Sequence, residues 1–252
     1  MPRITIIIPV YNEELQLKNK IDVLRQLKSS FSDELEIIIF DSNSTDQSAG
    51  YLNLLVTKDI AQVHFLNQQF QSEKSIGKAL IQACQKAAGD VILILPVDVD
   101  ISSDQINLVL KLSLVSFFWG AFLKRYDSNN FLMKFYESLQ NIVLSKILKQ
   151  VVWTNVFFFN KNLAKLIPEV GFLEDLIFCD RLNEIAPPHF IESSVIVNIR
   201  KYKKDGLNRR IFFNGIILLL FRCGYRDLQT LKQFYAGKMN LLGLVKKILT
   251  QG

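Results

Sequence analysis

Runs of aliphatic and β-branched residues recur through the first hundred residues, and this recurrence constrains the fold more than any other feature of the sequence. ITIIIPV (4–10), LEIIIFD (35–41) and VILILPV (91–97) are continuous apolar runs, typical of strands buried on both faces of a sheet. QVHFLNQ (62–68) is a further candidate strand, and helical patterns lie between the runs, including one from about 77 to 88. This alternation predicts a parallel sheet with right-handed crossovers.

The second half of the chain is less regular, but its apolar spacing still predicts elements. Helical spacing over about 130–148 is set by Phe131, Phe135, Leu139, Ile142, Val143 and Ile147. We also expect strands at 119–127, 151–160 and 195–203, a loop opening into a helix within 171–185, and helices at 207–222 and 227–235. The chain shows no repeat or linker, so we expect one mixed α/β domain with a C-terminal helical extension.

Polar residues follow three of the predicted strands. Asn12-Glu13-Glu14 comes after the first run, Asp41 ends the second, and Asp98 and Asp100 follow the fourth. We expect Asn12 to cap the helix that follows it. Since ligands of parallel sheets bind at the carboxyl ends of the strands, these groups predict a single site.

Each of these acidic groups also has a simpler interpretation. Asp41 and the loop behind it suit a nucleobase or ribose edge, but Asp41 or Asp46 equally suits a helix cap. Asp98 and Asp100 suit Mg²⁺ or Mn²⁺ on a diphosphate, but the segment also reads as a turn, with Asp100 or Ser102 as a helix cap. Both interpretations stay open at the level of local sequence.

Two further groups are candidate site residues because they lie at the starts of predicted helices. The Glu174-Asp175 pair places a carboxylate where it can serve as a general base, although acids in a first helical turn also complement the helix dipole. Lys78, after Gly77, begins a helix whose N-terminus suits a phosphate group.

Read in order, these segments resemble the family 2 glycosyltransferases of the GT-A fold. The resemblance runs from about residue 4 to 182, through IIIPVYNEE (6–14), FDSNSTDQS (40–48), Gly-Lys-Ala (77–79), AAGDVILILPVDVD (87–100) and LEDLIFCDRL (173–182). WGAFLKRYD (119–127) and the basic and hydrophobic C-terminal segment are similar to a compact bacterial branch of that family. The resemblance implies a Rossmann-like mixed sheet, with a nucleotide-binding half (1–100), an acceptor and catalytic half (101–205) and a helical extension (206–252).

The resemblance also implies roles for individual residues in inverting transfer from a nucleotide-diphosphate sugar, commonly UDP-linked. The nucleotide would be held by Pro9, Tyr11, Asn12, Glu13, Asp41, Lys78 and Asp98. A divalent metal, Mg²⁺ or Mn²⁺, would be held by Asp98 and Asp100. Asp175, beside Glu174, would be the catalytic base. Trp153, Arg181, Arg200 and Lys201 are candidates for contact with the acceptor or the diphosphate.

Three positions depart from the family pattern. Ser42-Asn43 stands where the family has an acid or glycine, Pro96 aligns with the first acid of the metal motif, and Trp153-Thr154-Asn155 replaces Gly-Asp-Gln. They keep open an alternative: a catalytically impaired protein of this fold that binds nucleotide or serves as a scaffold. A nucleotidyltransferase is disfavoured, because no Gly-rich phosphate loop lies near the N-terminus.

The formal net charge of +6 is unevenly distributed. RKYKKDGLNRR (200–210) holds six cations and one acid and precedes IFFNGIILLLF (211–221), a composition suited to an anionic membrane surface and a lipid-linked acceptor. The alternative is that the apolar run packs on the sheet. The basic patch is local, which disfavours a nucleic-acid partner. Three separated cysteines and no evident signal peptide predict a cytoplasmic protein, with peripheral attachment to the inner membrane face as a variant.

Overall fold

The computed structural model describes residues 4–65, 76–114 and 119–251. The chain divides into two compact units, Met1–Asn198 and Ile199–Gly252. All strands of the described residues belong to the first unit, and the second unit is helical.

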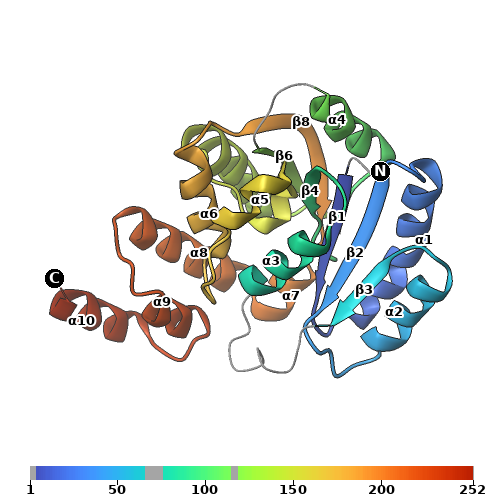
Figure 1. Ribbon diagram of the computed structural model, residues 1–252. Helices are drawn as coiled ribbons and strands as arrows, with labels where there is room; N and C mark the ends of the chain where they lie inside the picture. The colour runs from blue at the N-terminus through green and yellow to red at the C-terminus, as the bar shows by residue number, and fades with distance from the viewer. Residues whose placement is uncertain (1–3, 66–75, 115–118, 252) are drawn as a thin grey trace. The chain divides into compact units, whose positions relative to one another are not determined.

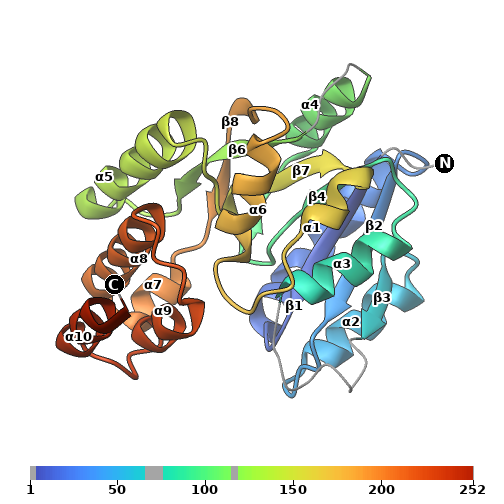
Figure 2. The ribbon, with the colours of Figure 1, turned by 60° about the vertical axis from the view of Figure 1, so that its left-hand side comes forward.

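An eight-stranded mixed sheet forms the centre of the first unit (Figures 1 and 2). Its strand order is β3-β2-β1-β4-β7-β6-β8-β5. The strands are β1 (Ile4–Val10), β2 (Leu35–Asp41), β3 (Gln62–Phe65), β4 (Val91–Ile94), β5 (Val99–Asp100), β6 (Trp119–Tyr126), β7 (Phe157–Asn160) and β8 (His189–Val197). β1 to β4 are mutually parallel, as predicted, and β7 runs antiparallel to β4 and to β6.

Helices cover both faces of this sheet (Figure 1). They are α1 (Glu14–Ser30), α2 (Ser48–Thr57), α3 (Ile76–Lys86), α4 (Ser103–Ser113), α5 (Phe131–Leu139) and α6 (Glu174–Asn183). The right-handed crossovers place α1 and α2 on one face and α3 on the other. On the α3 face, Leu80 and Ala83 join Ile7, Ile94 and Phe178 of α6 in one buried apolar cluster. The prediction of a mixed α/β sheet flanked by helices is therefore confirmed.

Two predicted strands are shorter in the structure. The strand expected at 195–203 ends at Val197, where its partners Val99 and Tyr126 also end their pairing, and the basic run continues as α7 (Arg200–Asp205). The strand expected at 151–160 begins only at Phe157, because Trp153–Asn155 forms a 3-10 turn, η3. Of the strand predicted at 62–68, residues 62–65 are β3 and 66–68 lie outside the described residues.

The helix predicted at 130–148 is present, but it continues beyond α5 as a π-helix, η2 (Gln140–Ile147). The side chain of Asn130 caps α5 by accepting the N–H groups of Leu132 and Met133 at 2.9 and 3.3 Å. The apolar residues whose spacing predicted this helix are exposed, whereas Met133, Tyr136 and Leu144 are buried. The periodicity was correct, and the face that it marks points outward.

The second unit contains α7, α8 (Leu207–Arg222), α9 (Leu228–Tyr235) and α10 (Leu241–Gln251), which include both predicted helices. Its small core includes Ile217, Phe221, Leu231 and Phe234, and the rings of Phe213 and Phe234 lie 4.6 Å apart. Among the residues that the structure describes, no helix is long and apolar enough to cross a membrane.

Gly120 of β6 provides a test of this packing. A β-carbon at this position would overlap the carbonyl oxygen of His189 and the ring of Phe158. We expect Gly120→Ala to lower the free energy of unfolding by about 1–3 kcal/mol, measured by urea denaturation. Gly215→Ala is the matched control, because its new methyl group meets nothing within 4 Å in α8 and should raise stability by a few tenths to about 1 kcal/mol. Equal stability of Gly120→Ala and the parent protein would contradict the close approach of these strands.

Candidate functional site

The loops after β1 and β2 are joined by reciprocal hydrogen bonds. The Asn12 N–H donates to Ser44 Oγ at 2.9 Å, and the Thr45 N–H donates to Asn12 Oδ1 at 2.8 Å. Asn12 has a φ of 52°, a left-handed conformation that asparagine tolerates better than most residues. The prediction that Asn12 caps α1 is therefore wrong, because its side chain is used to hold the neighbouring loop.

Each of these loops caps the helix that follows the other. The N–H groups of Glu13 and Glu14 donate to Ser48 Oγ and Asp46 Oδ2 at 3.1 and 3.2 Å, and the Gln47 N–H donates back to Glu14 Oε2 at 3.0 Å. Asp46 also accepts the Ser48 N–H at 3.0 Å at the start of α2, although the N-cap position of that helix is Gln47. These bonds hold the segment after β1 against the segment after β2 at one edge of the sheet.

Asp41 is a buried carboxylate at the end of β2. It accepts the Ser44 N–H at 3.3 and 3.2 Å and the Ser44 hydroxyl at 2.6 Å. Asn43 takes the left-handed conformation, with φ at 60°, so asparagine occupies a turn position where the family pattern has glycine. The absence of glycine is thus accommodated, and Asp41 is held in place by its own loop.

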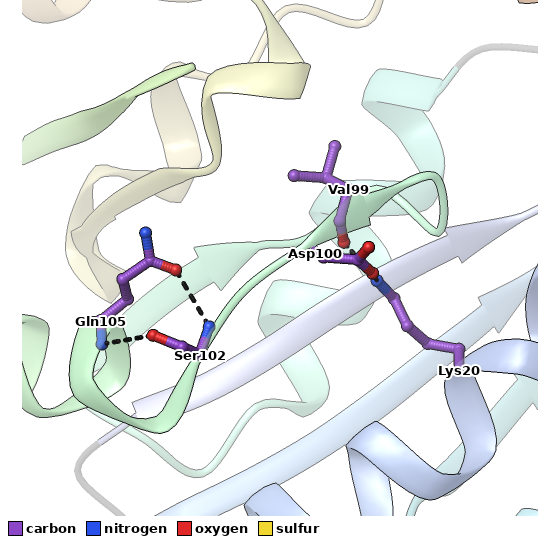
Figure 3. Close-up of polar contacts among 5 residues, drawn as sticks. All are labelled: Lys20, Val99, Asp100, Ser102 and Gln105. Atoms are coloured by element: carbon purple, nitrogen blue, oxygen red, sulfur yellow. Dashed lines mark hydrogen bonds and ion pairs between the residues drawn. The ribbon is translucent and has the colours of Figure 1, made fainter. Parts of the chain in front are cut away.

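Asp98 and Asp100 follow β4, and the buried Lys20 lies beside Asp100 (Figure 3). Lys20 of α1 donates to the carbonyl of Val99, and its Nζ lies 3.0 Å from Asp100 Oδ1. Burial lowers the pKa of Lys20, while Asp100 and Asp98 raise it. Asp98 lies in a turn closed by the Val99 N–H donating to Pro96 O at 3.1 Å, so the turn interpretation of this segment is also correct.

These acids meet the chemical requirement for a divalent ion only together with a ligand. The described residues contain no group of three or more His, Cys, Asp or Glu side chains that could hold a metal. Mg²⁺ bound through substrate phosphates needs only one or two protein carboxylates, and Asp98 and Asp100 fit that demand. Ser102 caps α4 with Gln105 in a capping box, so the helix-capping interpretation holds for Ser102 (Figure 3).

Asp175 lies in the first turn of α6, next to the buried Glu174. Its carboxylate accepts the Leu176 N–H at 2.9 Å and the Trp153 N–H at 3.3 Å. Burial raises the pKa of the Asp175 carboxyl, and the two N–H groups and the charge of Lys124 oppose part of that rise. A carboxylate whose pKa is raised by its surroundings is a better proton acceptor.

Lys124 of β6 is a site residue that the sequence reasoning missed. Its side chain is 1% exposed, and its Nζ lies 3.4 Å from Thr154 Oγ1, in the turn that contacts Asp175. Burial lowers the pKa of Lys124 to about 7, against the attraction of Asp175 and Glu137. The alternation of side chains along a strand could have indicated that Lys124 is buried, since it shares a face with Phe122 and Tyr126.

Trp153 packs its ring near Phe157 and Phe178, at centroid distances of 5.0 and 6.3 Å. This supports a core position for the ring. Its buried indole Nε1 nevertheless has no hydrogen-bond partner among the described residues. A buried donor without a protein partner is the kind of group that a ligand hydroxyl satisfies.

Strand directions place these groups at one edge of the sheet. β1, β2 and β4 are parallel, so the segments at Asn12, Asp41 and Asp98 follow their carboxyl ends. β7 is antiparallel to both β4 and β6, so the end of β6 near Lys124 and the turn before β7 lie at that same edge. The sequence prediction of one convergent site agrees with this topology.

The remaining predicted residues have the following positions. Pro9 is half-buried in β1, Tyr11 is exposed, and Lys78 is half-buried in the first turn of α3. Arg181 is exposed on α6 and donates to Leu166 O at 2.9 Å. Arg200 and Lys201 belong to α7 in the second unit.

Comparison with known proteins gives one matching protein family. Residues 5–168 match the family described as Glycosyl transferase family 2. An "Uncharacterized glycosyltransferase" of Haemophilus influenzae is 36% identical over 122 residues, 46% of this chain and 45% of the relative. A Campylobacter jejuni protein named GalNAc(5)-diNAcBac-PP-undecaprenol beta-1,3-glucosyltransferase is 24% identical over 111 residues, 44% of this chain and 34% of the relative. The chain thus matches less than half the length of either relative.

Solved structures share the fold at low sequence identity. A mannosyltransferase from Pyrobaculum calidifontis, in complex with GDP-Man and Mn²⁺, has a TM-score of 0.60 at 20% identity, over 86% of this chain and 62% of that one. Glucosyl-3-phosphoglycerate synthase from Mycobacterium tuberculosis, in complex with Mn²⁺, UDP and glucosyl-3-phosphoglycerate, has a TM-score of 0.59 at 17% identity, over 90% and 81% of the two chains. The predicted GT-A architecture is therefore confirmed.

The depressed pKa of Lys124 makes the stability of the protein depend on pH. The folded amine loses its proton near pH 7, whereas an unfolded lysine keeps its proton up to about pH 10.4. Between these values the unfolded chain binds more protons than the folded one, so the free energy of unfolding rises with pH. Lys124→Met removes this dependence. We expect its stability relative to the parent to fall by about 2 kcal/mol between pH 7 and 9, measured by urea denaturation. The exposed Lys134→Met is the control, and a constant difference for Lys124→Met would contradict the buried amine.

Proposed function

The chain belongs to glycosyl transferase family 2, and from this premise we propose that it transfers a sugar from a nucleotide-diphosphate sugar to an acceptor hydroxyl, with inversion at the anomeric carbon. We expect the donor to be UDP-linked. The observation that supports the proposal is that Asp41 and Asp98 follow parallel strands at one edge of the sheet, and that Asp175 accepts a hydrogen bond from Trp153, in the turn before β7 at the same edge.

The donor would bind across the loops after β1 and β2. The turn Pro9–Glu13 and Asp41 supply carboxylate, amide and carbonyl groups suited to a nucleobase and ribose. Because the reciprocal bonds of Asn12 and Ser44 order this surface before a ligand arrives, little conformational entropy is lost on binding. Lys78, at the start of α3, adds a cation for the diphosphate.

Asp98, with Asp100, would hold the divalent metal together with the diphosphate oxygens. When bound, such an ion neutralises the charge that develops on the departing nucleotide diphosphate. We expect Asp98 to contribute more to metal binding than Asp100, since the Asp100 carboxylate is paired with Lys20.

Asp175 would take the proton of the acceptor hydroxyl. The acceptor oxygen then forms a bond to the anomeric carbon as the bond from that carbon to the diphosphate breaks, and the nucleotide diphosphate leaves with the electron pair. The charge of Lys124 lowers the pKa of Asp175 and so would favour its ionised form before the acceptor binds. The Trp153 indole N–H would donate to a hydroxyl of the acceptor or the sugar.

We further propose a lipid-linked acceptor and a cytoplasmic protein attached peripherally to the inner membrane face. The undecaprenol in the name of the Campylobacter relative supports such an acceptor. The basic residues of α7, including Arg200 and Lys201, suit anionic headgroups or a diphosphate.

A second candidate is a nucleotide-binding or scaffold protein of the same fold that does not turn over substrate. It is favoured by Pro96 at the position of the first metal-motif acid and by Lys20 at the Asp100 carboxylate. Nucleotide binding with no transfer would support it.

Calorimetry with UDP tests the donor site and the register of the metal motif. With Mn²⁺ present, we expect Asp98→Ala to weaken UDP binding by about tenfold or more, and Asp100→Ala to weaken it less. The comparison without Mn²⁺ isolates the metal-dependent part. The reverse order would show that Asp100 is the ligand, and no binding of UDP, GDP or dTDP by the parent would favour the second candidate.

Substitution of the proposed base tests the chemical step. We expect Asp175→Asn to lower sugar transfer by at least about 10²-fold and to leave UDP affinity nearly unchanged. Release of UDP from a panel of UDP-sugars, with extracted bacterial lipid as acceptor, measures the transfer. Glu184→Gln, at the exposed end of α6, is the control. Transfer at the parent rate by Asp175→Asn would exclude Asp175 as the base.

A further inference from the structure

The outer face of α5 and η2 is covered by large apolar side chains that nothing in the described structure buries. The exposed fraction reaches 85% at Phe131, at the start of this face. Its members, called here the α5–η2 face, are Phe131, Leu132, Phe135, Leu139, Ile142, Val143 and Ile147. They follow one another at helical spacing over roughly 25 Å, a far more continuous patch than scattered surface hydrophobics.

The orientation of this helix is set by polar contacts on its inner side. Asn141 bonds the backbone of Lys124 twice, accepting its N–H at 3.1 Å and donating to its carbonyl at 2.8 Å. Glu137 accepts the Tyr126 N–H at 2.7 Å, and Gln140 accepts the Tyr126 hydroxyl at 2.6 Å. The helix is thus held to β6 by its polar side, and rotating it to bury the apolar face would break these bonds.

The change from α-helix to π-helix keeps the far end of the face in line. Ile142 and Ile147 are five residues apart, and in an α-helix they would be rotated by about 140° from each other. In a π-helix the hydrogen bond runs between residues five apart, which brings such pairs onto one side. Both residues are exposed, at 55% and 64%. Val143, four residues before Ile147, would share its side in an α-helix as well, so the π-helix adds Ile142 to a face that helical spacing already sets.

The exposed charges on this segment are lysines. Lys134, Lys146 and Lys149 lie on or directly after this segment, and all three are exposed. Glu137 is the one acid between residues 128 and 150, and its carboxylate is bonded inward to β6. Lys146 lies 3.8 Å from Glu192, a separation at which an exposed pair contributes little.

The second unit, considered by itself, has the same chemistry. Residues 199–252 hold twelve lysines and arginines and two aspartates, a formal charge of +10. On α10, Leu241, Leu242 and Val245 are exposed, while Leu244 packs into the core of that unit. Two separate parts of the chain thus present exposed apolar helix faces among lysines, a combination typical of helices that lie on anionic membranes.

We propose that the α5–η2 face is a docking surface for an anionic lipid bilayer, with its apolar side chains in the headgroup and acyl boundary and its lysines on the headgroups. A second copy of the chain fits this surface less well. In a two-fold dimer through this face the same lysine fringe would meet itself, and like charges oppose that pairing. The proposal does not depend on sugar transfer, because it concerns only the surface.

Co-sedimentation with vesicles tests the proposal on the full chain. The probes are vesicles of phosphatidylcholine mixed with phosphatidylglycerol, and of phosphatidylcholine alone. We expect the parent to bind the anionic vesicles, and the Leu139→Ser/Ile142→Ser double variant to bind them at least about tenfold more weakly. The control is Leu54→Ser/Ile185→Ser, which removes the same residue types at similar exposure, 44% and 47% against 46% and 55%, from other surfaces of the first unit.

A second variant and a second measurement separate the outcomes. Lys134→Glu/Lys146→Glu should abolish the preference for phosphatidylglycerol and leave the thermal unfolding midpoint unchanged. Anionic vesicle binding by Leu139→Ser/Ile142→Ser at the parent level would overturn the proposal. So would a dimer seen by light scattering that this variant dissociates, with no vesicle binding by the parent, since the face would then be an interface between copies.

Discussion

The reciprocal hydrogen bonding between the loops after β1 and β2 is the constraint on which the candidate site depends. Asn12 gives its side chain to the second loop, and Ser48 and Asp46 cap the helix of the first. The second loop also has local bonds, since Asp41 accepts the Ser44 N–H and hydroxyl, but α1 has no side-chain cap from its own N-terminus and depends on the second loop for one. The two loops therefore hold each other at the edge of the sheet where Asp41 lies.

A second polar arrangement, built around Lys124, lies at the same edge. Burial of the Lys124 amine costs free energy. The charge of Asp175 and the hydrogen bond to the Thr154 hydroxyl offset part of that cost. The inner side of α5 and η2 holds the β6 backbone on both sides of this lysine. The helix that bears the outward apolar face is thus the helix that positions the strand beneath the proposed base.

Much of this was predictable from particular residues. The continuous apolar runs at 4–10 and 35–41 gave the parallel strands, and Glu174-Asp175 was correctly placed at the start of a helix. The errors have local causes. The alternation in 195–203 continues into a basic run, but the strand ends where its pairing with β6 ends. In the turn at Trp153–Asn155, the Asn155 side chain donates to Phe122 O at 3.0 Å, a contact with a residue far away in the sequence. Pairing partners far along the chain are not visible in a local pattern.

The sequence by itself determined the alternation of strands and helices in the first hundred residues, the helical period over 130–148 and the polar residues at strand ends, because hydrophobic periodicity and turn chemistry are local properties. Only the tertiary structure decided which face of α5 points outward, because Met133 and Tyr136 pack inward where Glu137 bonds the backbone of β6, and the apolar stripe is left exposed. It likewise paired Lys20 with Asp100 and buried Lys124 beside the site of Asp175, because such contacts join residues distant in the chain.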